Sequence, residues 1–225
     1  MNTIERNTYG INVQGFDDVI VNHLMAQGVV NSYIHNAFTS VNRGMFLTQE
    51  LTSLGNSDGV VFYNKERFLI EISTIGLMLN FSDVLKNVEK VAVVGSGVGY
   101  VVALISCLGK EVIGIEKDID LINQAKIHMS SLNIKNARFY EADFKTLAVG
   151  EKFSLIFVEG AITEPSPELI DMLYEDGEII AVRRNNNLAH IVSYKKVNNE
   201  LVIKPYKNVA TPFLVGFDNK MGFKF

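Results

Sequence analysis

Apolar and polar positions form regular blocks along the chain from Val91 onward, and these blocks predict strands and helices in turn. Short runs of β-branched apolar residues predict strands, and apolar residues three or four positions apart predict helices. Because strands that alternate with helices form parallel sheets with right-handed crossovers, this part predicts a doubly wound, mostly parallel α/β sheet. The expected strands are 91–94, 111–116, 137–140, 154–158 and 178–182, and the expected helices are 99–108, 118–132 and 165–174.

The two ends of the chain depart from this alternation. Near the carboxyl end, 189–196 and 201–206 predict two strands joined at 197–200, which makes an antiparallel hairpin at the sheet edge. The tail that follows carries aromatic residues, which predicts that it docks on the domain. The N-terminal part predicts mainly helices, at 17–28, 30–46 and 71–79, with a loop at 53–59.

These patterns divide the chain into an N-terminal helical segment, 1–85, and an α/β domain, 86–225, which we expect to form one compact unit. Residues 91–109 have no charge and are long enough to resemble a membrane span. Three glycines in the middle of this stretch favour a strand, a tight turn and a buried helix instead. Glu5 and Arg6, with no apolar run near them, argue against a secretory signal peptide.

Composition excludes several classes of protein. The 21 basic and 25 acidic residues give a net charge of −4, so the chain has no basic excess of the kind that nucleic-acid binding needs. The single cysteine excludes an internal disulfide framework and a multi-cysteine zinc site, and the four histidines share no spacing typical of a metal site. We therefore expect no metal, and a reducing, cytoplasmic compartment.

The segment Gly95-Ser96-Gly97-Val98-Gly99 joins an expected strand to an expected helix. Its third glycine comes one residue earlier than in the dinucleotide fingerprint, with Tyr100 at the fingerprint position, and it lacks the Gly-Lys-Ser/Thr ending of a triphosphate loop. Glycines allow positive φ angles and close approach of a ligand, and a helix N-terminus offers unpaired N–H groups to an anion. S-adenosylmethionine presents a carboxylate and no phosphate, so it suits such a loop.

Two carboxylates follow the next strands in order. Glu116 ends the second strand, where a carboxylate accepts hydrogen bonds from a ribose diol, and Asp143 follows the third, where it could accept from an adenine amine. Taken singly, the loop is also compatible with a ligand-free turn, Glu116 with a solvated strand end and Asp143 with a helix cap. Their order along successive strand ends favours a binding site over these alternatives.

With these motifs in place, the sequence resembles S-adenosylmethionine-dependent class I methyltransferases, and within them the protein-L-isoaspartate O-methyltransferase family. Residues 91–116, 153–161 and 167–177 carry the resemblance, and the tail at 204–225 resembles a divergent bacterial branch. The resemblance implies a Rossmann-like fold and methyl transfer from S-adenosyl-L-methionine, with S-adenosyl-L-homocysteine as product. It implies that the methyl acceptor is the carboxylate of isoaspartyl residues in damaged proteins. It also implies that neither nucleic acid nor a membrane is a partner.

The resemblance also implies roles for individual residues. Glu71 and Glu159 would act at the catalytic, acceptor side. The residues that would bind the cofactor are Gly95, Ser96, Gly97, Gly99, Glu116, Lys117, Asp143, Phe144 and Glu159.

Three positions depart from the family pattern. Val93 stands where an acidic residue usually precedes the first glycine, and a single glycine, Gly177, precedes the fifth strand. The family's Ile-Ser-Gln-Pro signature has no match; its best alignment, on 70–73, places Glu71 at the serine position, facing a carboxylate substrate. Arg67 is then expected either to neutralise this repulsion or to pair with Glu71. These departures leave two alternatives: a methyltransferase with another acceptor, such as an amine, or a degenerate domain that serves as an interaction module.

Overall fold

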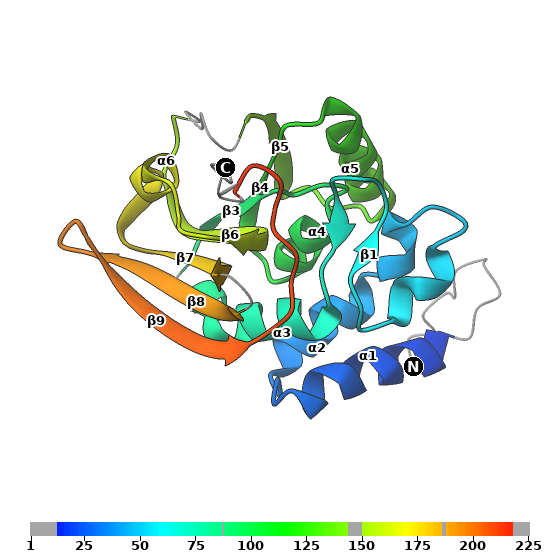
Figure 1. The fold of residues 1–225 in the computed structure, drawn as a ribbon. Coiled ribbons are helices and arrows are strands. Elements are labelled where there is room, and N and C mark those ends of the chain that lie inside the picture. The colour runs from blue at the N-terminus through cyan, green and yellow to red at the C-terminus, as the bar shows by residue number, and fades with distance from the viewer. Residues whose placement is uncertain (1–12, 87, 144–149, 186–187, 218–225) are drawn as a thin grey trace, which may run out of the picture.

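The computed structural model describes residues 13–86, 88–143, 150–185 and 188–217. In these residues seven strands form one mixed sheet in the order β5-β4-β3-β6-β7-β8-β9, with helices on both faces (Figure 1). The strands of this sheet are β3 (Lys90–Val94), β4 (Glu111–Glu116), β5 (Ala137–Glu141), β6 (Phe153–Ile162), β7 (Leu173–Asn185), β8 (Leu188–Val197) and β9 (Glu200–Asn208).

Five strands, β3 to β7, run parallel, as the alternation of strands and helices predicts. The β-branched residues of β3 are buried on both faces, which is typical of a central parallel strand. Val94 pairs with Ile115 of β4 and with Val158 of β6, so β3 and β4 end close together and β6 continues beyond them to Ile162. The connecting helices are α4 (Tyr100–Cys107), α5 (Ile119–Ser131) and α6 (Pro167–Asp171).

The antiparallel end of the sheet also agrees with the sequence pattern. β7 pairs with β8 and β8 pairs with β9, and the turn falls at Asn198 and Asn199, both with positive φ (53° and 62°). Asparagine tolerates this left-handed conformation, which two-residue hairpin turns require. The helix expected over 165–174 is shorter than predicted because Leu173 already pairs with Phe153 of β6, so β7 begins there.

The N-terminal part packs on one face of the sheet. It contains α1 (Val13–Ala26), α2 (Ser32–Ser40), η1 (Arg43–Phe46), η2 (Thr52–Asn56), a hairpin of β1 (Val61–Phe62) and β2 (Phe68–Leu69), α3 (Ile72–Phe81) and η3 (Asp83–Leu85). Leu24, Phe38 and Ile75 share one buried cluster with Val93 and Leu104, so this segment and the sheet have a common core. The sequence pattern missed the β1–β2 hairpin, because each strand has only two residues.

The tail after β9 docks on the sheet, as its aromatic residues predict (Figure 1). Ala161 N–H donates to the Pro212 carbonyl (2.8 Å) and Leu214 N–H donates to the Ala161 carbonyl (2.9 Å). Leu214 is buried beside Gly95, so the tail reaches the glycine loop. Phe223 and Phe225 lie outside the described residues.

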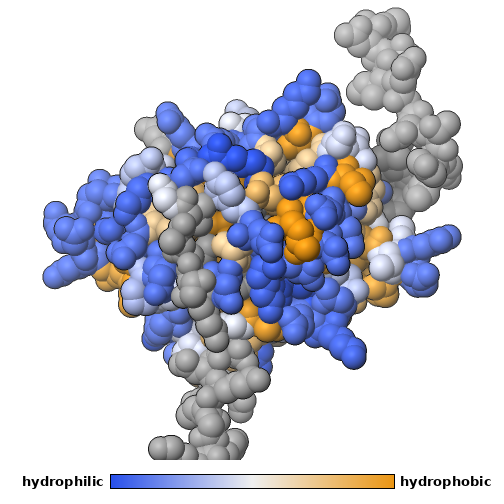
Figure 2. Space-filling model, turned by 90° about the horizontal axis from the view of Figure 1, so that it is seen from above, coloured by the Kyte–Doolittle hydropathy of each residue, from blue (hydrophilic) through white to orange (hydrophobic). Residues whose placement is uncertain are grey.

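The face seen in Figure 2 is mainly hydrophilic, with apolar residues in small, separate groups. None of the helices in the described parts of the chain has the length and apolar character that crossing a bilayer requires.

Candidate functional site

The glycine loop lies between β3 and α4, at the edge where the parallel strands end. Gly95, Gly97 and Gly99 all have positive φ (75°, 47° and 89°), a conformation that side chains rarely allow. Gly99 is the N-cap residue of α4. The sequence correctly predicts both the loop and its place in the fold.

Four amides of this loop already have partners within the chain, although a helix N-terminus normally leaves some unpaired. The amides of Gly95 and Ser96 donate to the Ile115 carbonyl, that of Gly97 to Oε2 of Glu116, and that of Gly99 to the Ser96 carbonyl.

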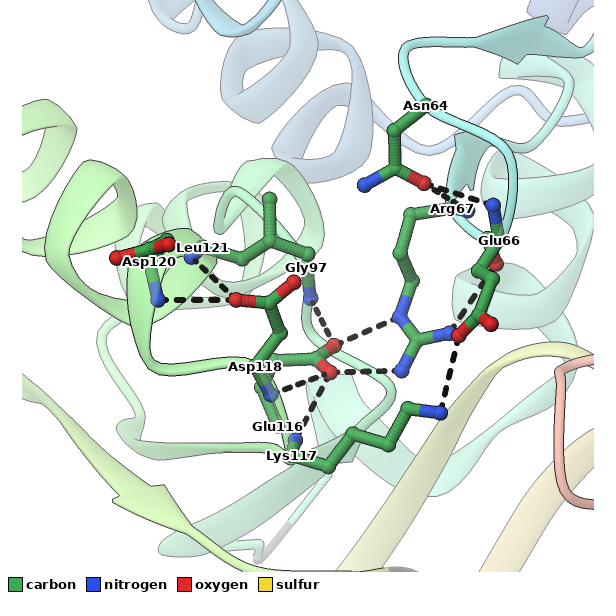
Figure 3. A network of polar contacts seen from close by, with 9 residues as sticks. All are labelled: Asn64, Glu66, Arg67, Gly97, Glu116, Lys117, Asp118, Asp120 and Leu121. Carbon is green, nitrogen blue, oxygen red and sulfur yellow. Dashed lines mark hydrogen bonds and ion pairs between the residues drawn. The ribbon is translucent and has the colours of Figure 1, made fainter.

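Glu116 is the centre of the polar network at this edge (Figure 3). The residue is fully buried, and Arg67 donates to both its oxygens, from Nη2 to Oε1 at 2.7 Å and from Nε to Oε2 at 3.0 Å. Gly97 N–H donates to Oε2 (3.1 Å), and the amides of Lys117 (2.8 Å) and Asp118 (3.2 Å) donate to Oε1. The carboxylate predicted to hold a ribose diol therefore lies against the glycine loop, with all its acceptor positions in use.

The partner of Arg67 corrects the expectation from the sequence. Arg67 was expected to face Glu71 or its substrate, but its guanidinium forms a buried ion pair with Glu116. Burial lowers the pKa of Arg67, but the hydrogen bonds and charge of Glu116 outweigh this, and the net direction is upward. Glu71, at the N-cap of α3, instead accepts a hydrogen bond from Thr211 Oγ1 of the tail (3.1 Å).

Tyr63 and Arg67 both belong to the β1–β2 hairpin, whose tip covers the glycine loop. The Tyr63 hydroxyl lies so close to Gly97 that a Cβ there would be 2.0 Å from it. Asn64 Oδ1 accepts from the amides of Glu66 and Arg67 and shapes the turn, and Glu66 pairs with Lys117 (3.0 Å). Figure 3 shows the side chains of Glu66 and Arg67 reaching from the hairpin towards the end of β4. The signal that could have found this hairpin is the turn sequence Asn64-Lys65-Glu66 between two apolar runs.

Glu159 lies on β6, the neighbour of β3 on its other side, and is 4% exposed. Its Oε2 has no hydrogen-bond partner in the described chain. Burial raises the pKa of Glu159 well above its ordinary value, the Glu116 charge raises it further, and Arg43 and Arg67 oppose the shift. Glu159 is therefore a buried carboxylic acid with a raised pKa beside the glycine loop.

Replacing Glu159 with glutamine is expected to stabilise the protein at high pH. A carboxyl whose pKa is raised on folding adds full stability below its unfolded value, near 4.5, and loses it as pH rises. Glutamine resembles the neutral acid, so Glu159→Gln should gain about 1–3 kcal/mol over the native chain at pH 8 and almost nothing at about pH 4. Denaturant unfolding at both pH values measures this, with exposed Glu200→Gln as control. Equal pH slopes for Glu159→Gln and the native chain would contradict it.

Among the other predicted site residues, Ser96, Lys117 and Asp143 lie at the same edge with different exposure. Ser96 is buried, and its Oγ has no partner in the described chain. Lys117 and Asp143 are exposed, after β4 and β5 respectively. Phe144 lies outside the described residues. In the described ranges, no cluster of three or more His, Cys, Asp and Glu side chains is arranged to hold a metal ion.

Arg43 is a buried residue that sequence reasoning missed. It is fully buried, and its guanidinium lies 3.0–3.5 Å from six backbone carbonyls on both sides of the hairpin. Burial lowers its pKa, and nearby Tyr100, Asp58, Glu159 and Glu71 oppose this. The six carbonyls belong to Leu54, Gly55, Ser57, Gly59, Leu69 and Ile70.

Comparison with known proteins identifies the family. The model of the protein-L-isoaspartate(D-aspartate) O-methyltransferase family matches residues 17–216. The chain belongs to this family. Members from Burkholderia ambifaria and Burkholderia lata, both named protein-L-isoaspartate O-methyltransferase, are 24% identical to it over 163 residues, 72% of this chain and 53% of theirs. The chain thus spans about half the length of these curated members.

Solved structures of the family share the fold. A beta-aspartate methyltransferase of Plasmodium falciparum, solved with S-adenosyl-L-homocysteine, has a TM-score of 0.75 and 20% identity, over 88% of this chain and 97% of that one. A second protein-L-isoaspartate O-methyltransferase has a TM-score of 0.74 and 21% identity, over 89% of this chain and 65% of that one. These likenesses establish the Rossmann-like architecture expected from the sequence.

Proposed function

We propose that this protein is an S-adenosylmethionine-dependent methyltransferase that methylates the carboxylate of isoaspartyl residues in proteins. The observation that carries the proposal is the contact between Gly97 N–H and Glu116 Oε2, which joins the glycine loop to a buried carboxylate one strand away. Family membership over residues 17–216 supports the same reaction.

The residues present fit the proposed cofactor. A ribose diol offers two O–H donors to a carboxylate, and Arg67 already offers two N–H donors to the same oxygens of Glu116. The positive φ angles of Gly95, Gly97 and Gly99 allow a ligand to approach the backbone closely. Ser96, Lys117, Asp143 and Phe144 would complete the cofactor side.

The reaction requires little from the protein beyond positioning the cofactor and the acceptor. The cofactor supplies an electrophilic methyl group, and an acceptor carboxylate is ionised at neutral pH, so no general base is needed. Glu159, if neutral, would lie near that acceptor without repelling it and would have a proton to donate in a hydrogen bond. We place Glu71 and Glu159 on the acceptor side, with residues 1–85 forming much of that side and 86–225 the cofactor side, in a cytoplasmic protein.

Two measurements test the function. Calorimetry with S-adenosylhomocysteine should show binding, and labelled methyl transfer from S-adenosylmethionine should reach an isoaspartyl peptide but not its aspartyl twin. Binding with no transfer to either peptide would point to another acceptor, such as an amine. Absence of binding at millimolar ligand would contradict both enzymatic functions, the isoaspartyl methyltransferase and the methyltransferase with another acceptor.

A specific observation favours one alternative, a degenerate domain that serves as an interaction module. The loop amides and both oxygens of Glu116 have partners within the chain, as they would in a domain that never takes up the cofactor. The calorimetric measurement separates this alternative from the proposal directly.

Replacing Glu71 with serine is expected to raise the rate on an isoaspartyl peptide, on the order of tenfold, because it removes a like charge facing the acceptor. Labelled methyl transfer measures the change. Thr211→Val is the matched control, because it removes the hydrogen bond to Glu71 and keeps the charge. Equal rates for the two variants would assign the effect to the lost contact and contradict the charge argument.

A further inference from the structure

The hairpin tip occupies the positions that a bound cofactor would use. Glu116 Oε1 accepts three hydrogen bonds and Oε2 accepts two, so the carboxylate has no strong acceptor position left for a diol. The Tyr63 hydroxyl lies against Gly97. A ribose diol can reach Glu116 only if the guanidinium of Arg67 leaves.

The hairpin is exposed at its tip and anchored at its base. Its strands pair at only two positions, Val61 with Leu69 and Phe62 with Phe68, and two-stranded hairpins are marginally stable on their own. Residues 64–66 are exposed, and the hairpin is not part of the seven-stranded sheet. By contrast, Arg43 holds the carbonyls of Gly59, Leu69 and Ile70 at the base.

Resting on the function proposed above, we propose that the β1–β2 hairpin is an internal occupant of the cofactor site, with Arg67 and Tyr63 displaced together when S-adenosylmethionine binds. The ion pair of Arg67 with Glu116 is exchanged for diol hydrogen bonds, so Glu116 is not left buried without donors. The closed hairpin lowers the apparent affinity for the cofactor, because only the open fraction of the protein binds it. The hairpin thereby sets the cofactor concentration at which the enzyme becomes active.

The first test weakens the contact between the hairpin and Glu116 by replacing Arg67. Arg67→Gln should bind S-adenosylhomocysteine about tenfold more tightly than the native chain in calorimetry, because the closed state loses its charged pair. Lys65→Gln is the matched control, since it removes a positive charge from the same exposed turn and no contact to Glu116. Equal or weaker binding by a folded Arg67→Gln variant would overturn the proposal.

The second test follows the hairpin with Arg67 intact, so it stands even if Arg67→Gln fails to fold. The chain has no tryptophan, so Phe62→Trp, at a position 54% exposed on the hairpin, provides a single fluorescent reporter. Its emission should shift on addition of S-adenosylhomocysteine, whereas that of Tyr174→Trp, at an exposed position of β7, should not. Calorimetric binding without a shift from Trp at 62 would overturn the hairpin proposal alone. Absence of binding by every variant would instead overturn the proposed function.

Discussion

Replacing Arg43 with methionine is expected to lower the free energy of unfolding by about 4 kcal/mol. The guanidinium is fully buried and donates to six carbonyls, of which that of Leu54 also accepts from the Ser57 amide. A buried acceptor left without its donor costs about 1–3 kcal/mol, and several would be affected together. Denaturant unfolding monitored by circular dichroism measures the loss.

Two further variants test whether the lost hydrogen bonds to carbonyls explain the Arg43 result. Arg43→Lys keeps the charge but lacks the planar fork that reaches carbonyls on both sides, so we expect about half the loss. Arg138→Met removes a guanidinium that is 47% exposed and bridges two surface carboxylates, and its effect should stay within about 1 kcal/mol. If Arg43→Met and Arg138→Met were equally stable, the carbonyl cluster would not hold this segment together.

Glu116→Ala should lower the free energy of unfolding by about 3–5 kcal/mol, because it leaves the Arg67 guanidinium buried without a counter-charge. It also removes the acceptor of the amides of Gly97, Lys117 and Asp118. The same substitution should weaken binding of S-adenosylhomocysteine by about 1.5–3 kcal/mol, through loss of charged hydrogen bonds to the diol. Unfolding and calorimetry measure the two effects separately.

A double-mutant cycle isolates the ion pair. Glu116→Gln with Arg67→Met removes both charges and should cost less stability than the two single changes Glu116→Gln and Arg67→Met added together, because no unpaired charge remains buried. If the double variant lost more free energy of unfolding than the two single variants together, the ion pair would not explain the instability of Glu116→Ala. If Glu116→Ala folded normally but bound ligand as tightly as the native chain, Glu116 would not be the ribose ligand.

The sequence determined the parallel sheet, the glycine loop and the place of Glu116, because each depends on local properties. β-branched runs such as Val91–Val94 form buried strands wherever they pack, and three closely spaced glycines allow a bend that other residues resist. Glu116 is the last residue of β4 and directly follows Ile115, so its position at the sheet edge follows from the strand itself.

Only the tertiary structure decided which partners the buried charges take. Arg67 lies four residues from Glu71, yet it pairs with Glu116, 49 residues further along the chain, because the β1–β2 hairpin folds over the end of β4. Arg43 likewise reaches carbonyls up to 27 residues away, and Glu159 lies on a strand that the tail covers. Desolvation and long-range pairing depend on which surface covers which, and no local pattern of residues carries that information.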